Sequence, residues 1–167
     1  NLKKFKKLNS YAVDNLFKID FIFLLSLMII DETDNTDYFL YKFNLSKKDQ
    51  KRLKLINNFY KEKVKITKLT EKNLNKIFYF NGKQAVIDII NFKLFTSNKV
   101  EKRLIQLIKV YQDKLIPTMP IEANMLMTKY NIPQGKTLGN KLKLIEEIWV
   151  NNSFNISDKQ VQKIVKG

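Results

Sequence analysis

The sequence contains neither cysteine nor histidine. It therefore lacks the residues that form disulfides, Cys/His zinc sites and thiol nucleophiles, and every acid–base scheme that depends on histidine is excluded. Few of the remaining side chains change their charge near neutral pH. The absence of cysteine is compatible with a cytoplasmic protein, which is the localisation we expect.

Glycine and proline are also scarce, with four and three residues among 167. An all-β protein would need more of both for its tight turns. Apolar residues instead recur at spacings of three and four, which predicts helices. We expect an all-α protein without substantial sheet, made of a helical body (residues 1–115) and a small helical tail (residues 116–167). The prolines at 117 and 120 predict the hinge between them.

No apolar run is long enough to suggest a membrane segment. The longest, Phe21 to Ile30, is about half of the ~20 residues that a bilayer requires, and it is interrupted by Ser26 and flanked by Asp20 and Asp31. This pattern predicts a buried core helix, and we expect no membrane partner.

Acidic residues follow this run: Asp31, Glu32, Asp34 and Asp37. A calcium-binding EF-hand loop would need Gly where Thr36 stands and Glu where Lys42 stands. We therefore expect a solvated acidic turn and no metal site.

Positive charge is in excess, with 31 basic against 16 acidic residues, a net charge of +15 and a pI near 9.8. Such a surplus favours a polyanionic partner such as RNA. All basic residues except Arg52 and Arg103 are lysine, a bias that an AT-rich genome would also produce, so the charge alone is only suggestive. On the helix predicted after Ser46, we select Lys47, Lys48 and Arg52 as candidate RNA contacts; the alternative is an ordinary solvated helix face.

Local signals predict several other helix boundaries. Capping residues indicate helix starts at Ser46 (with Asp49), Thr70, Asn98 and Ser157, and another helix is expected to start at Asn81-Gly82. We expect residues 2–9 to form a short basic helix and residues 61–69 to form an extended connector.

The most informative segment, Met119 to Leu142, predicts a helix, a tight turn and a second helix. Pro120 is expected to open the first helix, and Pro133 to end it by disfavouring the helical conformation of the preceding residue. Gly135 then permits a sharp turn, and the second helix is predicted to run through Trp149.

The start of this second helix is a candidate phosphate site, because its N–H groups and helix dipole favour an anion. We predict RNA contacts at Gly135 and Lys136, and at Asn140 and Lys143 farther along. The alternative is that Gly135 serves only as a helix C-cap and turn. For Gly139, inside the helix, tight helix packing is favoured over ligand contact, since glycine there costs ~1 kcal/mol relative to alanine.

The run Gly135-Lys136-Thr137 is similar to the end of a P-loop. The P-loop signature, however, needs glycine where Tyr130 stands, and a strand rather than a helix before it. We therefore expect no ATP or other cofactor to bind to this chain.

The segment resembles the C-terminal tail of the bacterial CCA-adding tRNA nucleotidyltransferases and of their relatives, the bacterial poly(A) polymerases. The resemblance covers roughly the last fifty residues. The residues that match the family pattern at the same spacing are Pro120, Ile121, Leu126, Met127, Ile132, Gly135, Leu138, Gly139, Leu142 and Trp149. The chain departs from the family pattern at Ala123, Met125 and Lys136, where glycine, an acid and proline are usual. The resemblance is looser at Phe43 to Ser46 and the Lys-rich helix that follows.

The resemblance implies a nucleotidyltransferase that adds CMP and AMP to the 3′ end of tRNA. In that family, catalysis belongs to an N-terminal head with a Gly-Ser turn and a pair of aspartates that hold magnesium, and neither pattern is found here. Because the chain also begins with Asn1 rather than Met, we expect it to be the body and tail of a longer enzyme, with no catalytic residue of its own. The resemblance further implies that magnesium, ATP and CTP bind to the missing head and that body and tail hold the tRNA.

Two other interpretations remain open at this point. The chain could be the same region of a poly(A) polymerase, which binds an RNA 3′ end, because body and tail do not separate the two activities. It could also be a free-standing helical domain that binds RNA or protein without catalysis.

Overall fold

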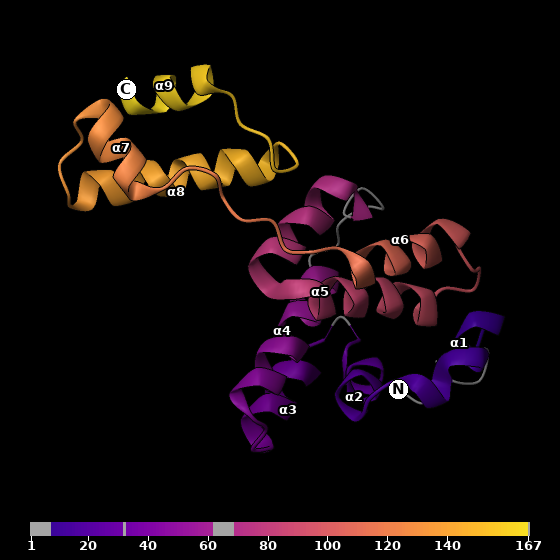
Figure 1. The fold of residues 1–167 in the computed structure, drawn as a ribbon. Coiled ribbons are helices and arrows are strands. Elements are labelled where there is room, and N and C mark those ends of the chain that lie inside the picture. Colours follow the sequence, from indigo (N-terminus) through magenta and orange to yellow (C-terminus); the bar gives the residue numbers. More distant parts are fainter. Residues whose placement is uncertain (1–7, 32, 62–68, 167) are drawn as a thin grey trace. The chain divides into compact units, whose positions relative to one another are not determined.

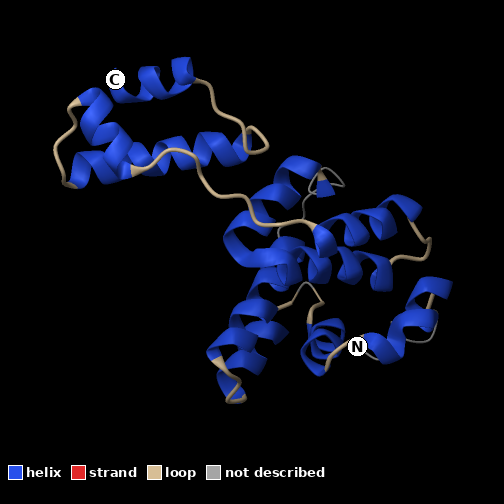
Figure 2. Cartoon of the chain, viewed as in Figure 1, coloured by secondary structure: helices blue, strands red, loops and turns tan. Residues whose placement is uncertain are grey.

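The computed structural model describes residues 8–31, 33–61 and 69–166, and over these ranges the chain is helical without a strand (Figures 1 and 2). The all-α prediction is therefore confirmed. The described helical elements are α1 (Ser10–Asn15), the short 3-10 helix η2 (Leu16–Lys18), α2 (Phe21–Ile29), α3 (Asn35–Lys42), α4 (Lys47–Lys61), α5 (Glu71–Thr96), α6 (Lys102–Asp113), α7 (Ala123–Tyr130), α8 (Lys136–Asn151) and α9 (Asp158–Lys166).

Several helix starts follow from local capping, as predicted. The Ser46 hydroxyl accepts the backbone N–H of Asp49 at 3.2 Å and donates to the Asp49 carboxylate at 2.6 Å. At α9, the Ser157 hydroxyl accepts the N–H of Gln160 at 3.3 Å, and the Gln160 side chain accepts the N–H of Ser157 at 2.9 Å. These reciprocal bonds pair backbone donors that a helix start leaves free.

Two predicted helix starts are wrong. Pro120 does not open α7, which begins at Ala123, and Asn98 does not cap α6, which begins at Lys102. The first fully buried side chain follows the helix start by three residues in α7, where it is Leu126, and by two in α6, where it is Leu104. Packing of an apolar face therefore sets these starts more strongly than the local sequence signal does.

Two expected segments lie wholly or largely outside the described residues. They are most of the short basic helix expected over residues 2–9 and nearly all of the connector expected over residues 61–69.

The chain divides into two compact units. The first contains the described residues before Thr70 together with Asn81–Lys114. In it, α2 packs against α3 and α4, and the Phe95 ring meets Phe23 edge to face at 5.6 Å between centroids. Its core cluster consists of Ala12, Phe23, Leu27, Ile30, Ile56, Phe92 and Phe95.

The second unit contains Thr70–Phe80 and the residues from Leu115 onward. Here α8 packs against α7 and α9. Tyr79, in the part of α5 before Gly82, meets Trp149 edge to face at 5.3 Å between centroids and donates its hydroxyl to Glu146 at 2.7 Å. Another core cluster consists of Leu126, Ile132, Leu138, Ile145 and Val161.

The two units do not coincide with the expected body and tail. A division near residue 115 is present, but Thr70–Phe80 belongs to the second unit rather than to the body. Within α5, Gly82 adopts a non-helical conformation (φ 81°, ψ 174°), which glycine tolerates because it has no Cβ. The helix is therefore two helices in sequence, in agreement with the helix start predicted at Asn81-Gly82.

Candidate nucleic-acid interface

The turn at Gly135 connects two helices that share a core. Helix α7 ends at Tyr130, and the C-cap residue Asn131 adopts a left-handed conformation (φ 52°, ψ 36°), a common way to end a helix. Ile132 and Leu138 are buried in the same cluster on either side of the turn. The residues between them are exposed, so the turn is fixed at both ends and open to solvent in the middle.

Gly135 is the N-cap of α8 and has a φ of 147°, a value that favours glycine. No side chain caps this helix start. The hydrogen bonds of the helix begin with the Gly139 N–H, which donates to the Gly135 carbonyl at 3.1 Å. The N–H groups of residues 136–138 therefore have no partner within the helix and, together with the helix dipole, form an electropositive end.

Three predicted contacts lie along one exposed stripe of this helix. Lys136, Asn140 and Lys143 are all exposed, and their spacing of four and three residues places them on one helix face. The buried side chains of Leu138 and Ile145 occupy other positions around the helix. The structure therefore places two lysines and one amide in a row that begins at the electropositive end.

Lys141, a nearby source of positive charge in the sequence, has a different role. Its ammonium group donates to the carbonyl oxygens of Ile164 at 2.9 Å and Val165 at 2.8 Å. These carbonyls belong to the last turn of α9, where a cation is favourable. Lys141 therefore attaches α9 to α8, and this partner, more than twenty residues away, could not be read from the sequence.

The expectation that Gly139 marks tight helix packing is wrong. Gly139 is exposed, and a Cβ added there would meet no heavy atom within 4 Å. The cost of glycine in a helix is thus not offset by a close helix contact.

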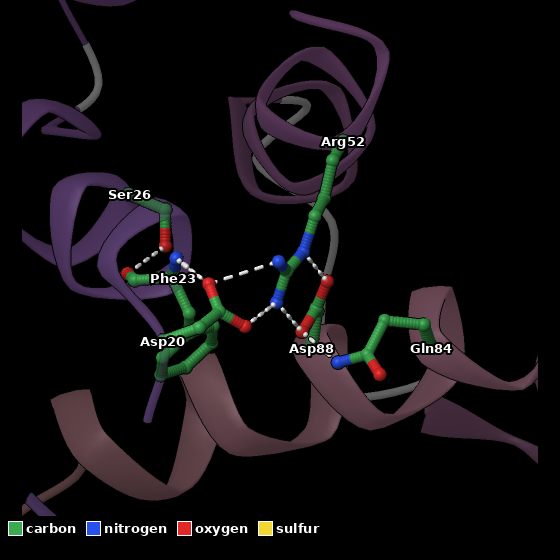
Figure 3. Close-up of polar contacts among 6 residues, drawn as sticks. All are labelled: Asp20, Phe23, Ser26, Arg52, Gln84 and Asp88. Carbon is green, nitrogen blue, oxygen red and sulfur yellow. Dashed lines mark hydrogen bonds and ion pairs between the residues drawn. The ribbon is translucent and has the colours of Figure 1, made fainter. Parts of the chain in front are cut away.

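The predicted contacts on α4 belong to the other unit. Lys47 and Lys48 are exposed in the first turn of the helix. Arg52 lies one turn farther on, but its guanidinium group is bound by two carboxylates (Figure 3). Arg52 therefore has a structural role in this position, and its RNA contact stays a prediction.

Arg52 connects the start of α2 to the second half of α5 (Figure 3). It donates to both oxygens of Asp20, at 2.9 and 2.7 Å, and to both oxygens of Asp88, one of them at 2.8 Å. The Gln84 amide adds a bond to Asp88 at 2.9 Å, and Asp20 also accepts the N–H of Phe23 at 2.9 Å. A partly buried arginine with two carboxylates thus holds three helical segments together.

The electrostatics of this group follow from its contacts. Burial by itself would raise the pKa of Asp20, but the hydrogen bonds and charge of Arg52 and the N–H of Phe23 outweigh it and hold the pKa below its usual value. Burial would lower the pKa of Arg52, yet its bonds to Asp88 and Asp20 raise it instead. Asp20 and Arg52 are therefore charged at neutral pH. The group lines a cavity of about 380 Å³.

Neither metal ligands nor a membrane-spanning helix is found in the described part of the chain. Over these residues, no three carboxylates gather in a group that could hold a metal ion. None of the described helices is both long and apolar enough to cross a bilayer.

No family model matches the chain, and no curated protein or solved structure matches it either.

Proposed function

We propose that this chain is the tRNA-binding body and tail of a CCA-adding tRNA nucleotidyltransferase. The observation that carries the proposal is the exposed turn at Gly135, in the segment whose sequence resembles that family. Its uncapped helix start continues into the exposed stripe of Lys136, Asn140 and Lys143. This is an arrangement suited to a chain of phosphates.

The physical role of such a surface is to hold RNA without reading its sequence. Duplex RNA is recognised largely through its shape, its phosphates and its 2′-hydroxyls. Lysines supply mobile point charges and a helix start supplies fixed N–H donors. In the proposed enzyme, the head supplies the nucleotides, the metal and the chemistry, and this chain binds and orients the tRNA.

The same surface would serve a poly(A) polymerase of the same family, and a free-standing RNA-binding domain is the alternative from another class. The reading frame upstream of Asn1 distinguishes these classes. The proposal expects it to encode a Gly-Ser turn after a strand and a pair of aspartates. A purified longer product should then add CMP and AMP to tRNA, whereas addition of AMP alone would identify a poly(A) polymerase.

The role of the Gly135 turn is tested by Lys136→Glu in the 167-residue chain. Because Lys136 is exposed, the variant should fold normally. It should bind tRNA more weakly, and the slope of log K against log salt should decrease in magnitude by about one, as expected for a lost phosphate contact.

Lys159→Glu is the matched control, with the same charge change in the same unit. The bonds from Lys141 place the end of α9 beside the first half of α8, so exposed Lys159, at the start of α9, lies toward the other end of α8. Lys159→Glu should therefore change phosphate binding at the turn only slightly, since charges more than ~10 Å apart are screened at moderate salt. Equal effects of the two variants would remove the assignment of a phosphate to the turn.

A further inference from the structure

Helices α3 and α4 form a hairpin whose closed end carries exposed aromatic rings. The connection between them is short, from Phe43 to Ser46, and the two helices pack against each other. Figure 1 shows them side by side in the purple part of the chain. Tyr41 is 91% exposed and Phe43 is 49% exposed. Exposed apolar side chains that gather at one place, unlike scattered ones, can mark an interaction site.

Tyr41 is the most open of these rings. The neighbouring Tyr38 has the Lys42 ammonium group 5.7 Å from its ring centroid. Phe43 is stacked on Phe39, with 4.3 Å between centroids and 27° between planes. Of the three exposed aromatics of the hairpin, Tyr41 therefore offers the largest exposed surface to a ligand.

The same end of the hairpin is strongly basic. Lys42 ends α3, and Lys47 and Lys48 begin α4, all exposed. Lys51 and Lys54 continue along α4 and are also exposed. From Tyr38 to Lys54 the only carboxylate is Asp49, which accepts the Ser46 hydroxyl. Asp37, directly before this range, is also exposed, so the surface combines open rings with a net positive charge.

This combination fits unpaired nucleotides better than a protein partner. Lysine is depleted in protein–protein interfaces, whereas proteins that bind single-stranded nucleic acid pair basic residues with aromatic rings on which bases stack. Bases inside a duplex do not expose their faces, so a ring at this position selects unpaired ones. The large exposed apolar side chains of the hairpin are all aromatic.

We infer that the closed end of the α3–α4 hairpin binds unpaired RNA nucleotides, with Tyr41 stacking on a base and Lys42, Lys47 and Lys48 binding the adjoining phosphates. This inference rests on the proposed function, which supplies RNA as the ligand. It adds a base-stacking role for Tyr41, which the positive charge of the chain alone does not imply. The site belongs to the first unit, whereas the Gly135 turn belongs to the second.

The test uses the whole chain, an oligoadenylate of about 12 nucleotides, an RNA duplex of the same length, and fluorescence anisotropy against salt. Tyr41→Leu should weaken oligoadenylate binding about five-fold or more, since a stacked base contributes ~1–3 kcal/mol. The salt slope should stay unchanged because no charge is lost. Tyr41→Phe, which keeps the ring, should retain the affinity.

Phe17→Leu is the matched control, because this ring is 97% exposed but lies in η2, outside the hairpin. It should leave the oligoadenylate affinity unchanged. Lys47→Gln should instead weaken binding and reduce the salt slope by about 0.7, the value expected per phosphate on a single strand.

Each of the following results would overturn the inference. The first is an unchanged oligoadenylate affinity in Tyr41→Leu, and the second is an equal loss on the duplex. The third is self-association of the chain that Tyr41→Leu abolishes, which would identify the hairpin as a protein-docking surface. If oligoadenylate does not bind but tRNA binds in a manner sensitive to Lys136→Glu, the inference fails and the proposed function stands.

Discussion

Replacement of Arg52 by leucine should be among the most destabilising single changes on α4. The substitution keeps an apolar side chain that can pack along the helix but removes every bond to Asp20 and Asp88. Asp88 then remains buried, with its side chain only 2% exposed. Its remaining described side-chain bond is the one from Gln84.

The size of the effect follows from the different burial of the two carboxylates. The Asp20 side chain is 52% exposed and can regain water, so its share of the loss should be less than ~1 kcal/mol. The Asp88 side chain is almost fully buried, and a buried charge left without its partner costs about 3–5 kcal/mol. The expected loss is therefore about 3–5 kcal/mol, a large part of the ~5–15 kcal/mol that stabilises a typical domain.

Urea denaturation followed by far-UV circular dichroism measures this loss. Lys51→Leu is the matched control, since it removes an exposed positive charge from the neighbouring position and should change the free energy of unfolding by ~0.5 kcal/mol or less. The double variant Arg52→Leu/Asp88→Leu should recover part of the stability, because it removes the stranded charge. A loss below about 1 kcal/mol in Arg52→Leu, or a double variant less stable than the single one, would refute the reasoning.

Three other predictions concern helix ends and pH. Gly139→Ala should stabilise the chain by about 0.5–1 kcal/mol. Gly135→Ala should destabilise it, because the φ of 147° at this position strains any residue with a Cβ. Thermal melts compare the two variants. Lys141→Met should reduce the stability of α9 by about 1 kcal/mol, which hydrogen exchange would report as lower amide protection in that helix. Lys143→Met should leave this protection unchanged. Ionised Asp20 stabilises the fold above its unfolded pKa of ~3.9, and this contribution is lost as pH falls through its lower folded pKa. The difference in melting temperature between wild type and Asp20→Asn should therefore be smaller at about pH 3 than at pH 6.

The parts of the fold that the sequence predicts correctly are governed by local interactions. The capping pairs at Ser46 and Ser157 form between residues three apart, and the break at Gly82 depends on the glycine itself. Helix starts fail where packing decides them, as at Ala123 and Lys102. The membership of Thr70–Phe80 in the second unit depends on aromatic contacts such as Tyr79 with Trp149, which no local pattern reveals.

The same distinction holds for the candidate site. The turn at Gly135 and its exposed helix start could be predicted because glycine, proline and apolar spacing act within a few residues. The roles of Arg52 and Lys141 could not, since their partners lie 23 or more residues away in the chain. A lysine or arginine in a sequence shows that a charge exists, but only the folded chain shows whether a carboxylate or carbonyl already binds it.

The central claim is that this chain binds tRNA through phosphate contacts, and a salt titration tests it most directly. Anisotropy of labelled tRNA should show log K falling linearly with log salt, with a slope that reflects several phosphates. The affinity for tRNA should exceed that for an oligoadenylate, because only tRNA offers both duplex phosphates and unpaired bases. An affinity that stays flat as salt rises, or one no greater for tRNA than for the short single strand, would contradict the account.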